Sequence, residues 1–166
     1  MKSVGKYADI FSDPTFKYLL GEEGKQSMIS LLRTFLEIPD IEDIKYLPTE
    51  DIGMGKDDKR IHFDLACRTT GGQNFIVEAQ VAPQRFLNYR SMLYVSTMIR
   101  RAVRESQAEA KKKNTIWNYS FSPVYLLCLF KDTDGIAHDT SDCLHTYRMR
   151  DIKTGEDLDT DVSITL

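Results

Sequence analysis

Two alternating runs separated by a glycine pair, in the middle of the chain, constrain the fold most strongly. One face of the first run carries the apolar side chains of Ile61, Phe63, Leu65 and Cys67. One face of the second run carries the apolar side chains of Phe75, Val77, Ala79 and Val81. A period of two is typical of β-strands, and Thr69-Thr70-Gly71-Gly72 between the runs is a turn signal. The segment therefore predicts an antiparallel hairpin.

The two apolar faces also predict how the strands of this hairpin pair. They fall on one side of the sheet only if the numbers of facing residues sum to an even value. A three-residue loop over 70–72, with glycine in the left-handed position, satisfies this condition and places Asp64 directly opposite Glu78. Their Cβ atoms would then be about 5 Å apart, a separation at which like charges are destabilising. A divalent cation relieves such repulsion, and a phosphate ester is the natural substrate for it.

A plain hairpin whose solvated face happens to carry two acids is the competing interpretation. Acidic side chains are common on exposed strand faces, so the hairpin alone favours that reading. The second strand weakens it, because the chain is almost continuously apolar from Phe75 to Val81. Strands of this kind tend to be covered on both faces. A carboxylate pair buried there needs a partner.

Length and composition indicate a single soluble domain over residues 1–166. A chain of 166 residues with 42% hydrophobic and 28% charged residues can form one ordinary globular core. No apolar run approaches the roughly 18 residues of a membrane span, and the first residues lack the apolar segment of a signal peptide. Cys67, Cys128 and Cys143 are irregularly spaced, which predicts reduced thiols in a cytoplasmic protein without a zinc site.

Charge is distributed unevenly along the chain, although the net charge is only −3. Residues 83–113 contain eight basic and two acidic side chains, whereas residues 131–166 contain four basic and nine acidic ones. Attraction to phosphates depends on the local patch rather than on the net charge. The acidic total therefore does not exclude a nucleic-acid partner.

Helices and strands alternate along the rest of the chain. We expect helices over 13–20, 25–37 and 83–112, with Asp13 as the N-cap of the first and Pro14 at its first helical position. We expect strands over 41–47, 119–130, 144–149 and 162–166, an exposed loop over 48–60 and a turn over 132–135. This order predicts an α/β fold with a mixed sheet.

The long helix carries two stripes of side chains. The predicted core face consists of Phe86, Tyr89, Met92, Leu93, Ile99, Ala102 and Val103. A second stripe, at spacings of three and four, consists of Arg90, Tyr94, Thr97, Arg101 and Arg104.

An Asp, a glycine-bearing hairpin and a Glu-x-Gln on the second strand resemble the core of the PD-(D/E)XK nucleases. The closest resemblance is to the transposase-like, recombination-promoting branch of that superfamily. Three further stretches agree with that branch, and they are Phe11-Ser-Asp13-Pro-Thr-Phe16-Lys17, Arg90-Ser-Met-Leu-Tyr94 and Pro123-Val-Tyr-Leu-Leu-Cys-Leu-Phe130. The resemblance implies a restriction-endonuclease-like core, in which helices flank a mixed sheet with an antiparallel catalytic hairpin. It also implies a domain truncated at its C-terminal end.

The same resemblance implies roles for the residues of the hairpin. Asp64, Glu78 and the backbone carbonyl of Ala79 would hold Mg²⁺, with Mn²⁺ as a substitute. Gln80 stands where the superfamily usually has Lys, so it either donates hydrogen bonds to the attacking water or a phosphate, or is a structural strand residue.

Residues outside the hairpin have alternative roles. Lys17 or Arg90 could restore the positive charge that Gln80 lacks. Asp13 is either an active-site acid or only a helix cap. Arg90 and Tyr94 either face the substrate, with Arg90 binding a phosphate or pairing with Glu78 when metal is absent, or form a helix face packed beside the sheet. Arg101 and Arg104 either contact the DNA backbone or are simply solvated.

The resemblance implies a Mg²⁺-dependent DNA endonuclease of transposase type, which cuts double-stranded DNA with little sequence specificity. It is also compatible with a homodimer. One alternative is an inert member of the same fold that binds DNA or protein, which the Gln80 replacement and the acidic last segment favour. A third, unrelated interpretation is an α/β interaction domain without a metal site.

Overall fold

The computed structural model describes residues 8–51, 61–81, 86–131, 144–158 and 162–166. Its helices are α1 (Asp13–Leu20), α2 (Lys25–Leu36) and α3 (Leu87–Lys112). Its strands are β1 (Ile44–Tyr46), β2 (Glu50–Asp51), β3 (Ile61–His62), β4 (Leu65–Thr69), β5 (Asn74–Gln80), β6 (Val124–Phe130), β7 (Thr146–Tyr147) and β8 (Val162–Thr165).

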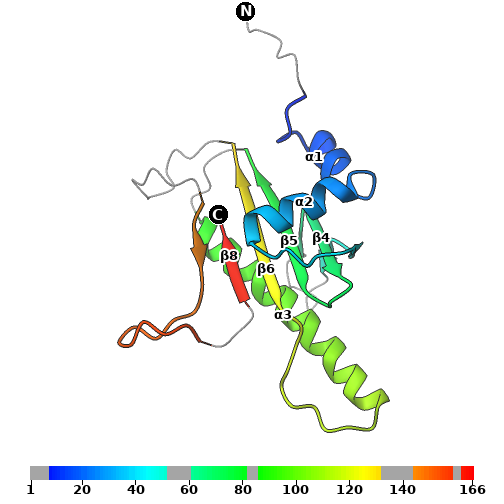
Figure 1. Ribbon diagram of the computed structural model, residues 1–166, viewed down its shortest axis with the longest axis vertical. Coiled ribbons are helices and arrows are strands. Elements are labelled where there is room, and N and C mark those ends of the chain that lie inside the picture. Colours follow the sequence, from blue (N-terminus) through cyan, green and yellow to red (C-terminus); the bar gives the residue numbers. More distant parts are fainter. Residues whose placement is uncertain (1–7, 52–60, 82–85, 132–143, 159–161) are drawn as a thin grey trace, which may run out of the picture.

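Six of these strands form one mixed sheet in the order β1-β4-β5-β6-β8-β7 (Figure 1). The pairs β1/β4, β4/β5 and β7/β8 are antiparallel, and the pairs β5/β6 and β6/β8 are parallel. Helix α3 connects β5 to its parallel neighbour β6, as parallel strands require a crossover. β2 and β3 form a separate antiparallel pair. The predicted α/β fold with a mixed sheet is confirmed.

The sheet has a hydrophobic core on each face. Helices α1 and α2 cover one face, where Phe16, Met28 and Leu32 pack on the β4 and β5 side chains Cys67 and Val77. Helix α3 covers the other face and packs on the alternate side chains of the same strands (Figure 1). Strand β5 is buried along nearly its whole length, which explains its continuous apolar sequence.

The hairpin of β4 and β5 has the predicted pairing. Leu65 lies opposite Val77 and Cys67 opposite Phe75, so both pairs fall on one side of the sheet as expected, and α1 and α2 cover that side. The loop spans residues 70–72, and Gly72 has a φ of 93°. A side chain rarely adopts this backbone conformation, which explains the glycine at the end of the loop.

The predicted core face of α3 is correct at Ala102, which is buried, and at Ile99, which packs against the core, but it is wrong for the first turns of the helix. The large side chains of its first turns are mostly exposed, with 59% of Phe86, 78% of Tyr89, 59% of Met92 and 50% of Leu93 accessible to solvent. The buried face instead consists of Ser91, Tyr94, Val95, Thr97, Met98 and Ala102. Ser91 and Ala102 are small, so the helix can approach the sheet closely, while Tyr94 buries its ring and keeps a hydrogen bond for its hydroxyl. Apolar content alone could not choose between the two stripes.

Several predicted boundaries shift. The N-cap of α1 is Ser12 rather than Asp13, and β6 begins at Val124 rather than at residue 119. Part of the predicted loop over 48–60 forms β2, and its remainder, the start of the long helix at 83–85 and the turn over 132–135 lie outside the described residues. Cys67 and Cys128 are free and buried, and Cys143 is not among the described residues. None of the described helices is both long and apolar enough to cross a membrane.

Candidate active site

Asp64 lies where the first half of the hairpin breaks. The chain pairs with β2 up to His62 and joins the main sheet only at Leu65. Between these points Phe63 turns to the α3 face, where its ring meets Tyr94 edge-on at 5.7 Å between centroids. The predicted alignment of Phe63 with Leu65 is therefore wrong, because the strand is interrupted between them. The break frees the backbone around Asp64 from regular pairing.

The carboxylates of Asp64 and Glu78 each accept a hydrogen bond from the backbone beside the other acid. The backbone N–H of Asp64 donates to Oε1 of Glu78 at 2.9 Å. The backbone N–H of Ala79 donates to Oδ2 of Asp64 at 2.8 Å. Each carboxylate thus replaces part of the backbone ladder at the break, and the two acids lie together as the register predicts. Backbone N–H donors stabilise a carboxylate without neutralising it with a cation.

Glu78 is buried, with 1% of its surface exposed. Burial raises its pKa from 4.5 to about 8, and the charge of Asp64 adds to this rise. The Asp64 N–H and the positive charge of Arg90 lower its pKa, but they do not outweigh burial. Burial therefore favours the protonated form of this side chain when no cation is bound. A group that must be neutral or paired with a positive charge is a strong candidate for a functional site.

Arg90 and Tyr94 of α3 complete this side of the site. Arg90 donates from Nη2 to the Tyr94 hydroxyl at 2.6 Å. The positive charge of Arg90 acts on Glu78, and both acids act on the pKa of the buried Tyr94, which burial raises. The sequence places these two side chains on one helix face, and the structure brings that face to the carboxylates. Arg90 is the cation that the structure associates with Glu78.

Gln80 lies two residues after Glu78 on the same face of β5 and is 6% exposed. Its position matches the predicted register, and its buried amide is on the α3 side with the acids. The structure also reveals Cys128, which the sequence analysis did not associate with the site. It faces Glu78 across the parallel pair of β5 and β6, and burial, followed by the charge of Glu78, raises the pKa of its thiol to about 12. Strand order was the missing information, because the hairpin pattern does not show which strand lies beside β5.

Asp13 and Lys17 pair with each other on α1. Lys17 Nζ is 2.8 Å from Asp13 Oδ1, and both side chains are more than half exposed, at 54% and 66%. The contacts described for these two residues do not include Asp64 or Glu78. Helix α1 packs on the sheet face opposite to the buried Glu78 side chain. The structure does not bring this pair to the carboxylates, and its part in catalysis stays a prediction.

The remaining arginines of the predicted stripe lie further along α3. Arg101 follows Arg90 by eleven positions, or about 16 Å along the helix axis. Its Nη1 donates to the Pro48 carbonyl at 3.0 Å, and its Nε lies 4.0 Å from Glu105. Arg101 therefore helps to attach the segment before β2 to α3. Arg104 is exposed and is the stripe member whose position suits contact with a large ligand.

The oxygen atoms at the hairpin break are of the type that Mg²⁺ and Mn²⁺ prefer. The hydrogen bonds at Asp64 and Glu78 engage one oxygen of each carboxylate, and the Ala79 carbonyl comes next in the chain. Among the described residues, no group of three or more His, Cys, Asp or Glu side chains could hold a metal ion. A metal that keeps several waters needs only one or two protein carboxylates, so this donor set is compatible with Mg²⁺ and does not suit zinc.

A comparison with known protein families finds a match over most of the chain. The family model for PD-(D/E)XK nuclease family transposases matches residues 10–166, which includes every residue discussed above. No curated protein and no solved structure gives a significant match. The match covers almost the whole chain and includes both carboxylates and the buried glutamine. The chain belongs to the family of PD-(D/E)XK nuclease transposases.

Proposed function

We propose that this protein is a divalent-metal-dependent DNA endonuclease of transposase type, with its active site at the break of the hairpin. Family membership indicates a nuclease-type function. The observation that favours activity is the buried Glu78 beside Asp64, each bound to the other's strand. Burying Glu78, with 1% of its surface exposed, beside the partly exposed Asp64 costs stability unless a partner is gained. A divalent cation would be such a partner, in addition to Arg90.

Asp64, Glu78 and the Ala79 carbonyl would hold Mg²⁺ or Mn²⁺. A bound divalent ion would lower the pKa of a water ligand and stabilise negative charge on the phosphate. The Ala79 N–H holds the Asp64 carboxylate in place, and the Asp64 N–H holds that of Glu78. Both ligands are thus oriented before substrate arrives, which reduces the entropy lost on binding.

Arg90 and Gln80 are the residues that we assign to the substrate. The Arg90 guanidinium retains donors beyond the one given to Tyr94 and suits a phosphate oxygen. The Gln80 amide can donate to the attacking water or to a phosphate, but it lacks the charge of the usual lysine. Arg90 then supplies the only positive charge that we assign to this side of the site.

A metal-dependent nicking assay tests this proposal. Purified protein should convert supercoiled plasmid to open circles in Mn²⁺, and a chelator should stop the reaction. Salt-sensitive DNA binding without any nicking would instead favour an inert member of the family. The buried glutamine in the lysine position is the observation that favours this second candidate function.

The exposed Arg104 should contribute to DNA binding through phosphates. Replacing it with Gln should weaken binding about equally for unrelated sequences and reduce the slope of log affinity against log salt by about one. Fluorescence anisotropy with a labelled duplex over a series of salt concentrations measures both effects. Arg101 is not suited to this test, because it bonds to Pro48.

Lys153 provides the matched control, since it is an exposed cation in the short hairpin after β7, which the antiparallel bridge between Arg150 and Asp157 closes. Lys153→Gln removes the same charge from a different part of the surface. If both variants change the salt slope equally, the effect reflects net charge and Arg104 has no specific contact with DNA.

A further inference from the structure

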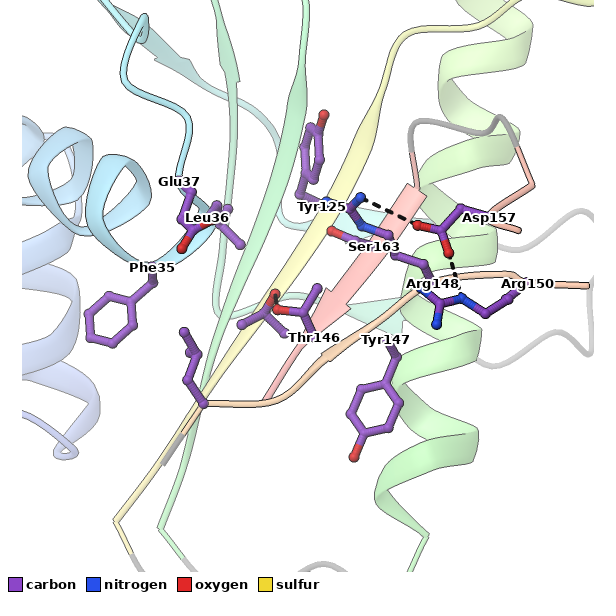
Figure 2. A pocket seen from close by; sticks show the side chains of 12 residues that line it. Phe35, Leu36, Glu37, Tyr125, Thr146, Tyr147, Arg148, Arg150, Asp157 and Ser163 are labelled. Carbon is purple, nitrogen blue, oxygen red and sulfur yellow. Dashed lines mark hydrogen bonds and ion pairs between the residues drawn. The ribbon is translucent and has the colours of Figure 1, made fainter. Parts of the chain in front are cut away.

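A pocket opens on the sheet face opposite to Asp64 and Glu78 (Figure 2). Its volume is about 500 Å³, within the range of pockets that hold small organic ligands. Its lining comes from the end of α2, the start of β6, β8 and the segment around β7. Tyr125 and Ser163 face each other in the parallel β6/β8 pair, and Tyr125 packs on the α1–α2 core. Glu78 is on the α3 face, so a ligand here would not occupy the active site.

One end of the pocket is cationic. Arg148 and Arg150 both reach Asp157, with Arg150 Nε 2.7 Å from Oδ1 and Arg148 Nη1 3.7 Å from Oδ2 (Figure 2). Two guanidinium groups offer ten N–H donors in total, and one carboxylate cannot satisfy them. The net charge of this cluster is +1. It can therefore accept a further anion beside Asp157.

The floor and the opposite end of the pocket differ in chemical character from the cationic end. The Thr146 and Thr165 hydroxyls are 3.1 Å apart on the floor, and Thr165 and the neighbouring Ser163 are buried. The Tyr125 ring is held flat against Phe75, at 5.1 Å between centroids and 18° between planes. The far end carries the apolar side chains of Phe35 and Leu36 (Figure 2).

An acidic side chain at the far end limits the class of ligand that the pocket can bind. Glu37 lies beside Leu36, across the pocket from Arg148 and Arg150 (Figure 2). A ligand that is only anionic gains nothing from a carboxylate, but an amino group on a planar ring can donate to one. The pocket thus combines an anion-binding end, a hydroxyl floor and an apolar end with a hydrogen-bond acceptor.

We propose that this pocket binds a nucleoside monophosphate, with the phosphate at Arg148 and Arg150 and the base toward Leu36 and Glu37. The pocket is much larger than an inorganic phosphate needs, and its two ends differ as the two ends of a nucleotide do. Such a unit has two sources, a free nucleotide or the phosphorylated end of a DNA strand. The site lies on the other face of the sheet from Asp64 and Glu78, so its occupancy does not depend on the proposed nuclease activity.

Isothermal titration with the four 5′-nucleoside monophosphates tests this proposal on the whole chain. At least one of them should bind saturably, and more tightly than inorganic phosphate or the matching nucleoside. Arg150→Gln should weaken that binding about tenfold or more, because a charge-assisted hydrogen bond is lost. Asp157→Asn should strengthen it several-fold, because the competing internal anion is removed. Lys153→Gln, a charge change on the same hairpin outside the pocket lining, should leave it unchanged.

Arg150→Gln and Asp157→Asn should change the nucleotide affinity in opposite directions. If the two residues only stabilised the fold, both variants should weaken binding. The side chains of Arg150 and Asp157 are 61% and 37% exposed, so both variants should fold, which circular dichroism can verify. Absence of saturable binding by all four nucleotides would overturn the proposal. So would equal affinities of wild type and Arg150→Gln, or weaker binding by Asp157→Asn.

A second pair of ligands distinguishes the two sources of the nucleotide. A short single strand with a 5′-phosphate should bind more tightly than the free nucleotide if the pocket receives a DNA end, and the same strand without phosphate should lose this advantage. Tighter binding of the free nucleotide assigns the pocket to a small-molecule ligand. Both results retain the nucleoside monophosphate as the recognised unit.

Discussion

Asp64→Asn and Glu78→Gln should each reduce metal-dependent plasmid nicking by at least about 100-fold. Both substitutions keep the size of the side chain and its ability to accept the observed backbone hydrogen bond, but each removes one negative oxygen donor. The loss should therefore appear in the rate of cleavage and not in the amount of folded protein. Nicking rates in Mn²⁺, normalised to protein that passes a thermal-melt check, measure the effect.

Asp40→Asn is the matched control for this experiment. Asp40 is an exposed acid before β1, outside both strands of the hairpin. Its replacement should leave the nicking rate within about twofold of wild type, as surface substitutions usually have small effects. Cleavage that persists unchanged in Asp64→Asn would assign any activity to other residues or to a contaminant.

In metal-free buffer, the free energy of unfolding should fall as the pH rises from about 4.5 to about 8. The folded protein holds the Glu78 proton up to a pKa of about 8, whereas the unfolded chain releases it near 4.5. A raised carboxyl pKa means that folding favours the protonated form, so the stabilisation is complete below 4.5 and is lost as the pH passes through 8. The expected loss is on the order of a few kcal/mol, because each tenfold difference in proton affinity between the folded and unfolded states contributes about 1.4 kcal/mol.

Glu78→Gln should remove most of this pH dependence, because the amide does not titrate. The variant should be more stable than wild type at pH 9 and about equal to it at pH 4. Urea unfolding at the two pH values, with a chelator present, gives the comparison. Asp64→Asn should give a smaller gain at pH 9, up to about 1 kcal/mol, since it removes only the repulsion between facing charges. A Glu78→Gln protein with the same pH profile as wild type would show that Glu78 is ionised in the folded state.

The sequence predicts the central hairpin well, for an identifiable reason. One-residue slips of an alternating strand exchange its two faces, so the apolar pattern determines that Leu65 faces Val77. The same pattern places Asp64 beside Glu78. It could not predict that Phe63 leaves this face, because the break depends on the separate pairing of β2 with β3.

Helix α3 shows where sequence periodicity is insufficient. Both of its stripes contain aromatic side chains, and the more apolar one is exposed at Tyr89 and Met92. The face that packs on the sheet is instead the one with Ser91 and Tyr94. Its small side chains allow close packing, and this orientation brings the positive charge of Arg90 near Glu78. Cys128 was missed for a similar reason, since the parallel neighbour of β5 is set by tertiary packing and not by local pattern.

The pocket around Arg148 and Arg150 had no sequence signal at all. Its residues come from α2, β6, β8 and the β7 region, each unremarkable alone. Only the sheet order, with β8 between β6 and β7, brings them together.

A titration of Mn²⁺ into metal-free protein, followed by the thermal unfolding midpoint, tests the central claim most directly. The claim is that Asp64 and Glu78 together hold a divalent ion. Mn²⁺ binding to the folded state should raise the midpoint of wild type in a saturable way. It should leave the midpoint of Asp64→Asn unchanged, and Asp40→Asn should behave as wild type. An equal Mn²⁺-dependent shift in wild type and Asp64→Asn, or no shift in wild type at saturating Mn²⁺, would contradict the account.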